Sequence, residues 1–205
     1  MTDEMRSIIV GTGSYIPPHR ISNKDFLNNR FLDREGNAFE KTNEEIIKDF
    51  ERITGIQERR YAPGDLVTSD MAKLAAEDAL GSANINRESL DYIIVAHNFG
   101  DARVDVRQGG LVPSLASRVK QKLGIKNPRT IPYDLPFGCP GWLQGMIQAD
   151  YFLRSGDASR ALVIGAETLS RVLDLHDRDS MLYADGAGAV IVEAVPCLKS
   201  LIQPS

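Results

Sequence analysis

The sequence predicts an α/β protein in which helices pack against a mostly parallel β-sheet. Residues 90–96 and 161–166 are continuous apolar runs of strand length, as expected for strands that are buried on both faces. Amphipathic segments of helical period alternate with such runs, and this alternation is typical of parallel sheets. Of the 205 residues, 42% are hydrophobic and 25% are charged, which fits a globular chain with a substantial core.

In the N-terminal part, residues 7–13 are predicted to form a buried first strand, and residues 42–53 to form a helix. Thr42 and Glu45 have the spacing of a capping box, in which each side chain accepts a hydrogen bond from a backbone N–H at the helix start. The other elements predicted here are a short helix over residues 23–30, a polar surface excursion over 33–41, and a solvated strand or loop over 56–62.

In the rest of the chain, Thr68 or Ser69 is predicted to cap a helix over residues 70–80. Two further strands, 180–185 and 187–195, are predicted to pair about a glycine turn. The remaining predictions are a strand over residues 90–96, a polar loop over 97–110, a helix over 114–123, a strand over 127–135, a strand over 161–166 and a charged loop over 167–179.

The stretch YDLPFGCPGWLQGMIQADYFL, residues 133–153, is predicted to run from a strand through a tight corner into a helix. Gly138 permits the corner, and Pro140 suits the first helical position, where its missing N–H costs nothing. Cys139 therefore lies at a helix N-terminus, where unpaired amides and the helix dipole favour a thiolate and could hold an oxyanion. The alternative is a buried, inert cysteine, and the glycine- and proline-rich corner argues against it. Trp142 is interpreted as core.

The motif DLPFGCPGW, followed by a long apolar helix, resembles the nucleophile motif of the β-ketoacyl-acyl-carrier-protein synthase III family, within the thiolase-like superfamily. Four other stretches resemble this family in the same order along the chain: IIVGTGSYIPPHRISN, ITGIQERRY, ALVIGAETLSR and DRDSMLYADGAGAVIVEA. The resemblance implies one half of a thiolase-like fold, the N-terminal one, with a five-stranded, mostly parallel sheet and helices on its faces. Residues 1–195 would form this domain, and residues 196–205 would begin a linker to a second half outside the chain.

The resemblance also implies a mechanism for Cys139. In the family a cysteine takes an acyl group from coenzyme A as a thioester, because a thiolate serves both as nucleophile and as leaving group. The thioester then condenses with the carbanion formed by decarboxylation of malonyl-acyl-carrier protein. A histidine and an asparagine of the C-terminal half stabilise the enolate. His19, His97 and His176 lie outside the family's motif for that histidine, and loop capping is the preferred role of His97. We therefore expect no condensation by this chain alone.

Binding residues follow from the same resemblance. Arg178 falls where the family has an arginine beside the adenine of coenzyme A, although a surface arginine paired with a neighbouring aspartate is the alternative. Arg52 and Thr54, near the TGI segment, are assigned to the coenzyme A site, and Leu169 either lines the tunnel or simply packs. Val112 falls where many members place a phenylalanine that closes the acyl pocket of the partner subunit. A smaller valine, and the absence of the family's cofactor-stacking tryptophan, predict a primer longer or bulkier than acetyl.

Composition limits the partners and the compartment. The net charge of −4 and the absence of a basic run argue against nucleic acid. The two cysteines suggest no disulfide framework and favour a reduced cytoplasm, and no apolar run approaches the ~20 residues that span a membrane. No metal and no permanently bound cofactor are expected. The expected partners are acyl-coenzyme A, acyl-carrier protein and a second copy of the chain, paired through the strand at 127–135.

Two classes of function remain open. The first is a condensing acyltransferase, either of synthase III type or resembling hydroxymethylglutaryl-coenzyme A synthase or type III polyketide synthase. The second is a non-catalytic, dimerising scaffold domain that keeps the fold. A redox role for Cys139 is weaker, because Cys197, the other cysteine, lies far away in the sequence. Reactivity of the Cys139 thiol near neutral pH distinguishes the first class from the second.

Overall fold

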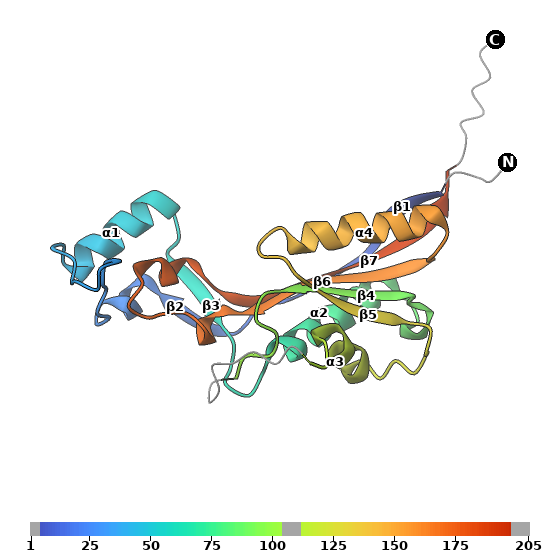
Figure 1. Cartoon of the computed structure of the whole chain (residues 1–205), viewed down its shortest axis with the longest axis horizontal. Coiled ribbons are helices and arrows are strands. Elements are labelled where there is room, and N and C mark those ends of the chain that lie inside the picture. Colours follow the sequence, from blue (N-terminus) through green and yellow to red (C-terminus); the bar gives the residue numbers. More distant parts are fainter. Residues whose placement is uncertain (1–4, 104–111, 198–205) are drawn as a thin grey trace, which may run out of the picture.

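A mixed five-stranded sheet forms the larger end of the elongated molecule (Figure 1). The computed structural model describes residues 5–103 and 112–197, and the structural statements below concern these residues. In spatial order the strands are β1 (Met5–Tyr15), β7 (Asp185–Pro196), β6 (Arg160–Thr168), β4 (Tyr92–His97) and β5 (Ile131–Pro136). β4 is parallel to both β5 and β6, whereas β7 is antiparallel to both β6 and β1.

Helices cover both faces of this sheet. α2 (Thr68–Ala83) and α3 (Leu115–Lys122) lie on one face, and α4 (Gly141–Ser155) lies on the other (Figure 1). The side chains of β4 contribute to the cores on both faces of the sheet. Its alternate side chains point to opposite faces, so Ile93 belongs to the core under α2 and α3, and Ile94 to the core under α4.

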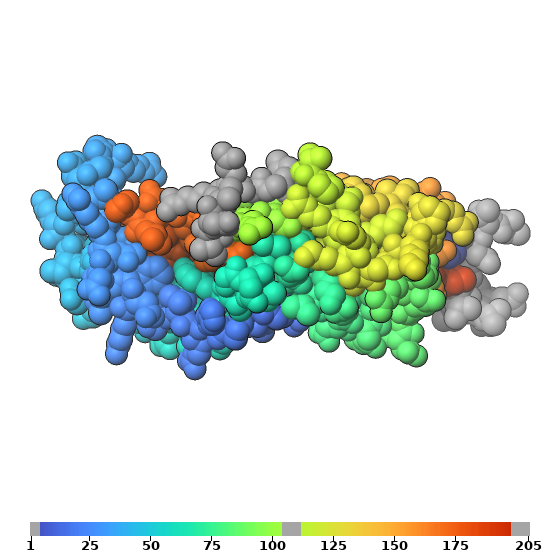
Figure 2. Space-filling model, turned by 90° about the horizontal axis from the view of Figure 1, so that it is seen from below, coloured from blue at the N-terminus to red at the C-terminus, as the bar shows by residue number. Residues whose placement is uncertain are grey.

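A small lobe forms the other end of the molecule and has its own core. The lobe comprises β2 (His19–Ser22), the 3₁₀ turn η1 (Asn23–Phe26), α1 (Asn43–Thr54), β3 (Glu58–Tyr61) and the 3₁₀ turn η4 (Arg178–Leu182). Figure 2 shows the blue N-terminal residues and an orange C-terminal segment gathered at this end. Its buried apolar residues are Phe26, Phe31, Ile46, Ile47 and Met181. Two short 3₁₀ turns, η2 (Arg87–Ser89) and η3 (Leu169–Arg171), lie outside the lobe.

The structure confirms an α/β fold with a five-stranded sheet, and several elements lie where the sequence predicts them. α1 begins after Thr42, whose hydroxyl accepts from the Glu45 amide while the Glu45 carboxylate accepts from the Thr42 amide, which completes the predicted capping box. β4 is buried, as its apolar run predicts, and Ser114 caps α3. The predicted helix at 23–30 is shorter and is the 3₁₀ turn η1.

Other predictions were wrong. Of the two strands predicted at 180–185 and 187–195, the first does not form, because residues 178–182 are the 3₁₀ turn η4. Residues 185–196 are one strand, β7, in which Gly186 pairs with β6, and Gly188 with both β6 and β1, instead of forming a turn. β1 lies at a sheet edge rather than in the interior, with Ile8 and Ile9 about half exposed. β5 begins at Ile131, later than predicted. The sheet is mixed rather than mostly parallel, because both pairings of β7 are antiparallel. α2 begins earlier than predicted.

Candidate active site

The corner between β5 and α4 exposes the Cys139 side chain to solvent. Gly138 has a positive φ of 78°, which allows the chain to turn sharply, and its carbonyl accepts from the Gly141 amide at 2.9 Å. Pro140 is the N-cap residue of α4 rather than its first helical residue, so Cys139 lies just before the helix start. The corner therefore presents Cys139 beside a helix N-terminus, as the sequence predicts.

Cys139 lines a cavity of about 360 Å³, which we call the cysteine cavity. Its walls come from the carboxyl ends of the parallel strands β4 and β6, from the first residues of β7, and from the corner itself. The carboxyl ends of parallel strands are where α/β proteins place their ligands. Leu169 also lines this cavity. Trp142 lies in its wall at 37% exposure, so its interpretation as core was wrong.

His97 lines the cysteine cavity and is buried; its Nδ1 accepts a hydrogen bond, whereas its Nε2 lies close to a carboxylate without a hydrogen bond of good geometry to any described residue. The Gly100 amide donates to Nδ1 at 3.0 Å, which caps the loop after β4, as the sequence analysis preferred. Nε2 lies 3.0 Å from Oδ2 of Asp134, a carboxylate that also accepts from the amides of Leu115 and Ala116. Burial alone would raise the pKa of Asp134, but the contact with His97 and the two amides outweigh it and hold the pKa below its ordinary value.

Glu167, at the end of β6, is the carboxylate of the cysteine cavity that sequence reasoning missed. Its Oε1 accepts from the Asn98 backbone amide and, at 2.8 Å, from the Asn98 side chain. Its Oε2 is buried and has no hydrogen-bond partner among residues 5–103 and 112–197. Burial is the main cause that raises the pKa of this carboxyl above its ordinary value. Its position directly after the apolar run 161–166 is a signal that could have identified it.

A second cavity, of about 460 Å³, lies in the small lobe, and we call it the lobe cavity. It brings together Arg52, Thr54 and Arg178, which the sequence analysis assigned to one site. The Arg178 guanidinium lies 4.9 Å from the ring centroid of Phe39, a residue the sequence analysis did not single out. Lys41 adds a third cation to this cavity.

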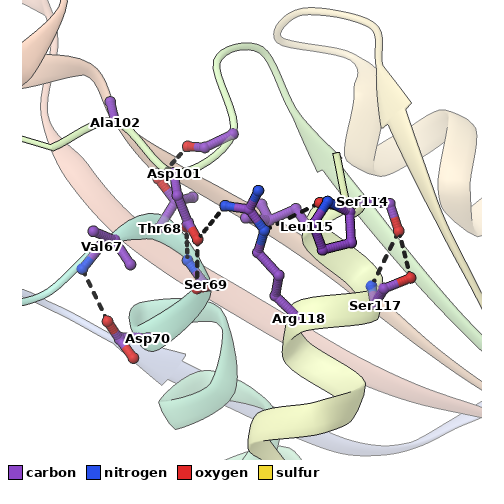
Figure 3. A network of polar contacts seen from close by, with 12 residues as sticks. Val67, Thr68, Ser69, Asp70, Asp101, Ala102, Ser114, Leu115, Ser117 and Arg118 are labelled. Atoms are coloured by element: carbon purple, nitrogen blue, oxygen red, sulfur yellow. Dashed lines mark hydrogen bonds and ion pairs between the residues drawn. The ribbon is translucent and has the colours of Figure 1, made fainter. Parts of the chain in front are cut away.

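Val112 lies outside both cavities and is 90% exposed. Arg118 of α3 holds the chain at this point, because its guanidinium donates to the carbonyls of Val112 at 3.3 Å and Pro113 at 3.0 Å. The same guanidinium donates to Asp101 at 2.8 Å, and Asp101 in turn accepts from the amide and hydroxyl of Ser69 (Figure 3). The structure therefore holds Val112 at the surface and does not bring it to Cys139.

The other histidines line neither cavity. His19 is exposed on β2, and His176 is exposed with its Nδ1 2.8 Å from the Arg30 carbonyl. Among residues 5–103 and 112–197, no cluster of side chains has the composition of a metal site. The helices of the described part are too short or too polar to cross a bilayer.

Comparison with known proteins agrees with this geometry. Residues 133–202, which include the cysteine corner, match the family described as 3-oxoacyl-[acyl-carrier-protein] synthase III. The structure is similar to β-ketoacyl-[acyl carrier protein] synthase III from Thermus thermophilus, with 35% identity and a TM-score of 0.71 over 90% of this chain and 50% of that one. It is also similar to 3-oxoacyl-[acyl-carrier-protein] synthase III from Aquifex aeolicus, with 33% identity and a TM-score of 0.72 over 91% and 53% of the two chains.

The priming β-ketosynthase of the R1128 polyketide pathway is a further similar structure, with 28% identity and a TM-score of 0.76 over 96% of this chain and 52% of that one. The chain thus spans about half the length of the solved structures that it matches. The fold and the cysteine corner define one half of a thiolase-like condensing-enzyme fold. Within that class, residues 133–202 match the 3-oxoacyl-[acyl-carrier-protein] synthase III family, and the chain is similar to solved structures of that name over about half of their length.

Proposed function

We propose that residues 1–195 form the cysteine-bearing domain of a condensing acyltransferase. Cys139 takes an acyl group from acyl-coenzyme A as a thioester, which then condenses with malonyl-acyl-carrier protein by decarboxylative Claisen chemistry. The observation that carries this proposal is the exposed Cys139 thiol at a helix start, inside a cavity at the carboxyl ends of parallel strands. A thiolate is favoured at such a position, and nearby amides can stabilise an oxyanion.

The lobe cavity is the proposed site for the nucleotide end of coenzyme A. Arg52, Arg178 and Lys41 provide cations for phosphates, and the exposed Arg178 guanidinium provides a flat surface on which a base can stack. Residues 178–188 connect the two cavities, because η4 lines the lobe cavity and the start of β7 lines the cysteine cavity. A ligand that extends along this segment would reach Cys139 with its acyl end.

Condensation is proposed to require groups that this chain does not supply. The enolate needs donors beside the thioester. Of the chain's three histidines only His97 lines the cysteine cavity, and its two nitrogens face Gly100 and Asp134. We propose that a second domain packs on the outer side of α4, because the side chains of Leu143 and Tyr151 are 57% and 64% exposed on this helix.

The remaining proposals concern the primer and the assembly. The exposed, small Val112 side chain supports an acyl pocket that is closed across a dimer and that accepts primers longer than acetyl. β5 lies at a sheet edge with Ile131 about half exposed, so a second copy could extend the sheet there. Faster acylation by acetyl-coenzyme A than by medium-chain donors would contradict the primer proposal.

The test is acylation of the purified chain, measured by intact mass after incubation with acetyl- and medium-chain acyl-coenzyme A. We expect one acyl group per chain, on Cys139, and its loss in Cys139→Ser. Cys197→Ser is the matched control, because Cys197 lines neither cavity, and it should be acylated like the unmodified chain. A Cys139 thiol that resists both acyl donors and iodoacetamide near neutral pH would instead indicate a scaffold domain.

A further inference from the structure

The cysteine cavity contains one carboxylate oxygen that the surrounding residues leave without a partner. Four of the described residues that line this cavity have titratable side chains, namely His97, Cys139, Glu167 and Asp185. Transfer of an acyl group to a thiol requires an acceptor for the thiol proton and a donor for the leaving thiolate. The acceptor can be identified by asking which of these groups has an unused atom.

His97 and Asp185 are each held by neighbouring groups. The Nδ1 of His97 accepts from Gly100, and its Nε2 makes no hydrogen bond of good geometry with a described residue but lies 3.0 Å from the Asp134 carboxylate, on the side of β5 and α3. Asp185 accepts from the Ser170 amide at 2.9 Å, from the Ser170 hydroxyl at 2.6 Å and from the Ala62 amide at 2.8 Å. Protonation of either group would disrupt these contacts, so neither is suited to cycle a proton during turnover.

Glu167 differs from both groups. Asn98 saturates Oε1 with two hydrogen bonds, and Oε2 is buried without a partner. Asn98 also connects this carboxylate to the nucleophile corner, since its Oδ1 would lie 4.0 Å from a Cβ built at Gly138, the residue before Cys139. Because Glu167 Oε2 is a buried acceptor without a donor among the described residues, the S–H group of Cys139 in the same cavity is a suitable donor for it.

We propose that Glu167 is the general base that accepts the thiol proton of Cys139 during acyl transfer, an inference that rests on the proposed function. The Cys139 proton moves to Oε2 of Glu167, and the sulfur forms a bond to the acyl carbonyl carbon. The bond from that carbon to the coenzyme A sulfur then breaks. Glu167 returns the proton to the departing thiolate, which leaves as coenzyme A thiol, and the carboxylate is regenerated.

The electrostatics around Glu167 suit this role. Burial and the nearby Asp185 carboxylate raise its pKa, whereas the Asn98 donors and His97 oppose the rise, and the pKa is raised on balance. A carboxylate that binds its proton more tightly than a solvated one is a better match for a thiol. Cys139, in the same cavity, is the group with which it would share the proton.

The test is the rate of Cys139 alkylation by iodoacetamide from about pH 5 to about pH 9, compared between the unmodified chain and Glu167→Gln. We expect Glu167→Gln to react about 10²-fold more slowly at neutral pH, at the low end of what a positioned base contributes. We also expect the lower inflection of the rate profile to disappear. Glu167→Asp keeps a carboxylate and should retain that inflection. The exposed Glu35→Gln is the charge-matched control.

Equal or faster alkylation of Glu167→Gln at neutral pH, in a chain whose far-ultraviolet circular dichroism is unchanged, would overturn the proposal. Because alkylation needs no acyl donor, it separates this inference from the proposed function. If the alkylation profile depends on Glu167 but the chain accepts no acyl group, the proposed function is wrong and the role of Glu167 as a base stands. A chain that is acylated equally well with glutamine at position 167 would have the function without this base.

Discussion

The sheet and the small lobe are stabilised in different ways. The sheet is filled by aliphatic side chains on both faces, such as Ile93 and Ile94 of β4. The lobe instead surrounds a cation, because Arg59 is 4% exposed and lies 4.9 Å from the ring centroid of Phe26. Its guanidinium donates to Asn23 Oδ1 at 2.7 Å and to the Met181 carbonyl at 3.0 Å.

The sheet positions the cysteine corner, and the lobe core positions the residues of the lobe cavity. Close packing gives the sheet the rigidity that a nucleophile corner requires. A buried cation is costly to desolvate and holds its place only while every partner is present. The lobe core therefore depends on a few directional contacts, and the residues of the lobe cavity depend on that core. The predictions below test whether the two regions can be disturbed separately.

The largest effect is expected from Arg59→Ala in the lobe. The substitution leaves buried acceptors of Asn23 and Met181 unpaired, at about 1–3 kcal/mol each, so the lobe should lose about 3–5 kcal/mol of stability. Hydrogen exchange should rise in α1, β2 and β3, whereas iodoacetamide should still alkylate Cys139 at the original rate. Arg60→Ala, a neighbour on β3 that is only partly buried, is the control and should change little. Loss of the whole fold in Arg59→Ala would show that the regions are not separable.

The next effect is expected in the sheet, from Gly13→Ala. A Cβ at Gly13 would lie 2.3 Å from both the Ala75 carbonyl oxygen and the Ala79 nitrogen, so β1 must move away from α2. We expect a loss of about 2–3 kcal/mol, measured by urea unfolding. Gly81→Ala, later in α2, meets no atom within 4 Å and should be neutral or slightly stabilising, by up to about 1 kcal/mol. Equal losses in both variants would contradict close packing of β1 on α2.

The smallest effect is expected from Asp134→Asn, which weakens the contact with His97 and the cap of α3. We expect a loss of about 1–2 kcal/mol at neutral pH. Because the folded-state pKa of Asp134 is depressed, its charge stabilises the fold above the unfolded pKa of about 3.9. This contribution is lost as the pH falls through the folded pKa, so the difference between the two proteins should shrink below about pH 4.

Thermal unfolding at several pH values measures this difference, and the exposed Asp65→Asn is the control. A difference that stays constant down to about pH 2 would mean that the Asp134 charge contributes nothing, and that the loss comes only from weaker hydrogen bonds.

Local sequence signals predicted the parts of the molecule that local chemistry decides. The capping box at Thr42 and the corner at Gly138 depend on neighbours in the chain, and both formed near their predicted places. A turn was predicted at Gly186 and Gly188 because of their residue type, whereas pairing with β6 and β1 keeps both glycines within the extended strand β7. The same long-range pairing, invisible in the local sequence, places β1 at an edge.

The candidate site divides in the same way. Cys139 could be identified from its motif, and the lobe residues Arg52, Thr54 and Arg178 from the resemblance, because each lies in a recognisable segment. The position of Glu167 after the apolar run 161–166 could have marked it as a candidate. That its Oε2 atom has no hydrogen-bond partner among the described residues follows only from the folded arrangement.

The uninterrupted course of β7 has a mechanical consequence. Extended backbone that is paired with neighbouring strands cannot lengthen or shorten, and only two residues separate the end of η4 from the start of β7. The distance between the lobe cavity and the Cys139 sulfur is therefore fixed by the fold. A molecule that engages both ends must carry an arm of matching reach, and one with a shorter arm can occupy only one end at a time.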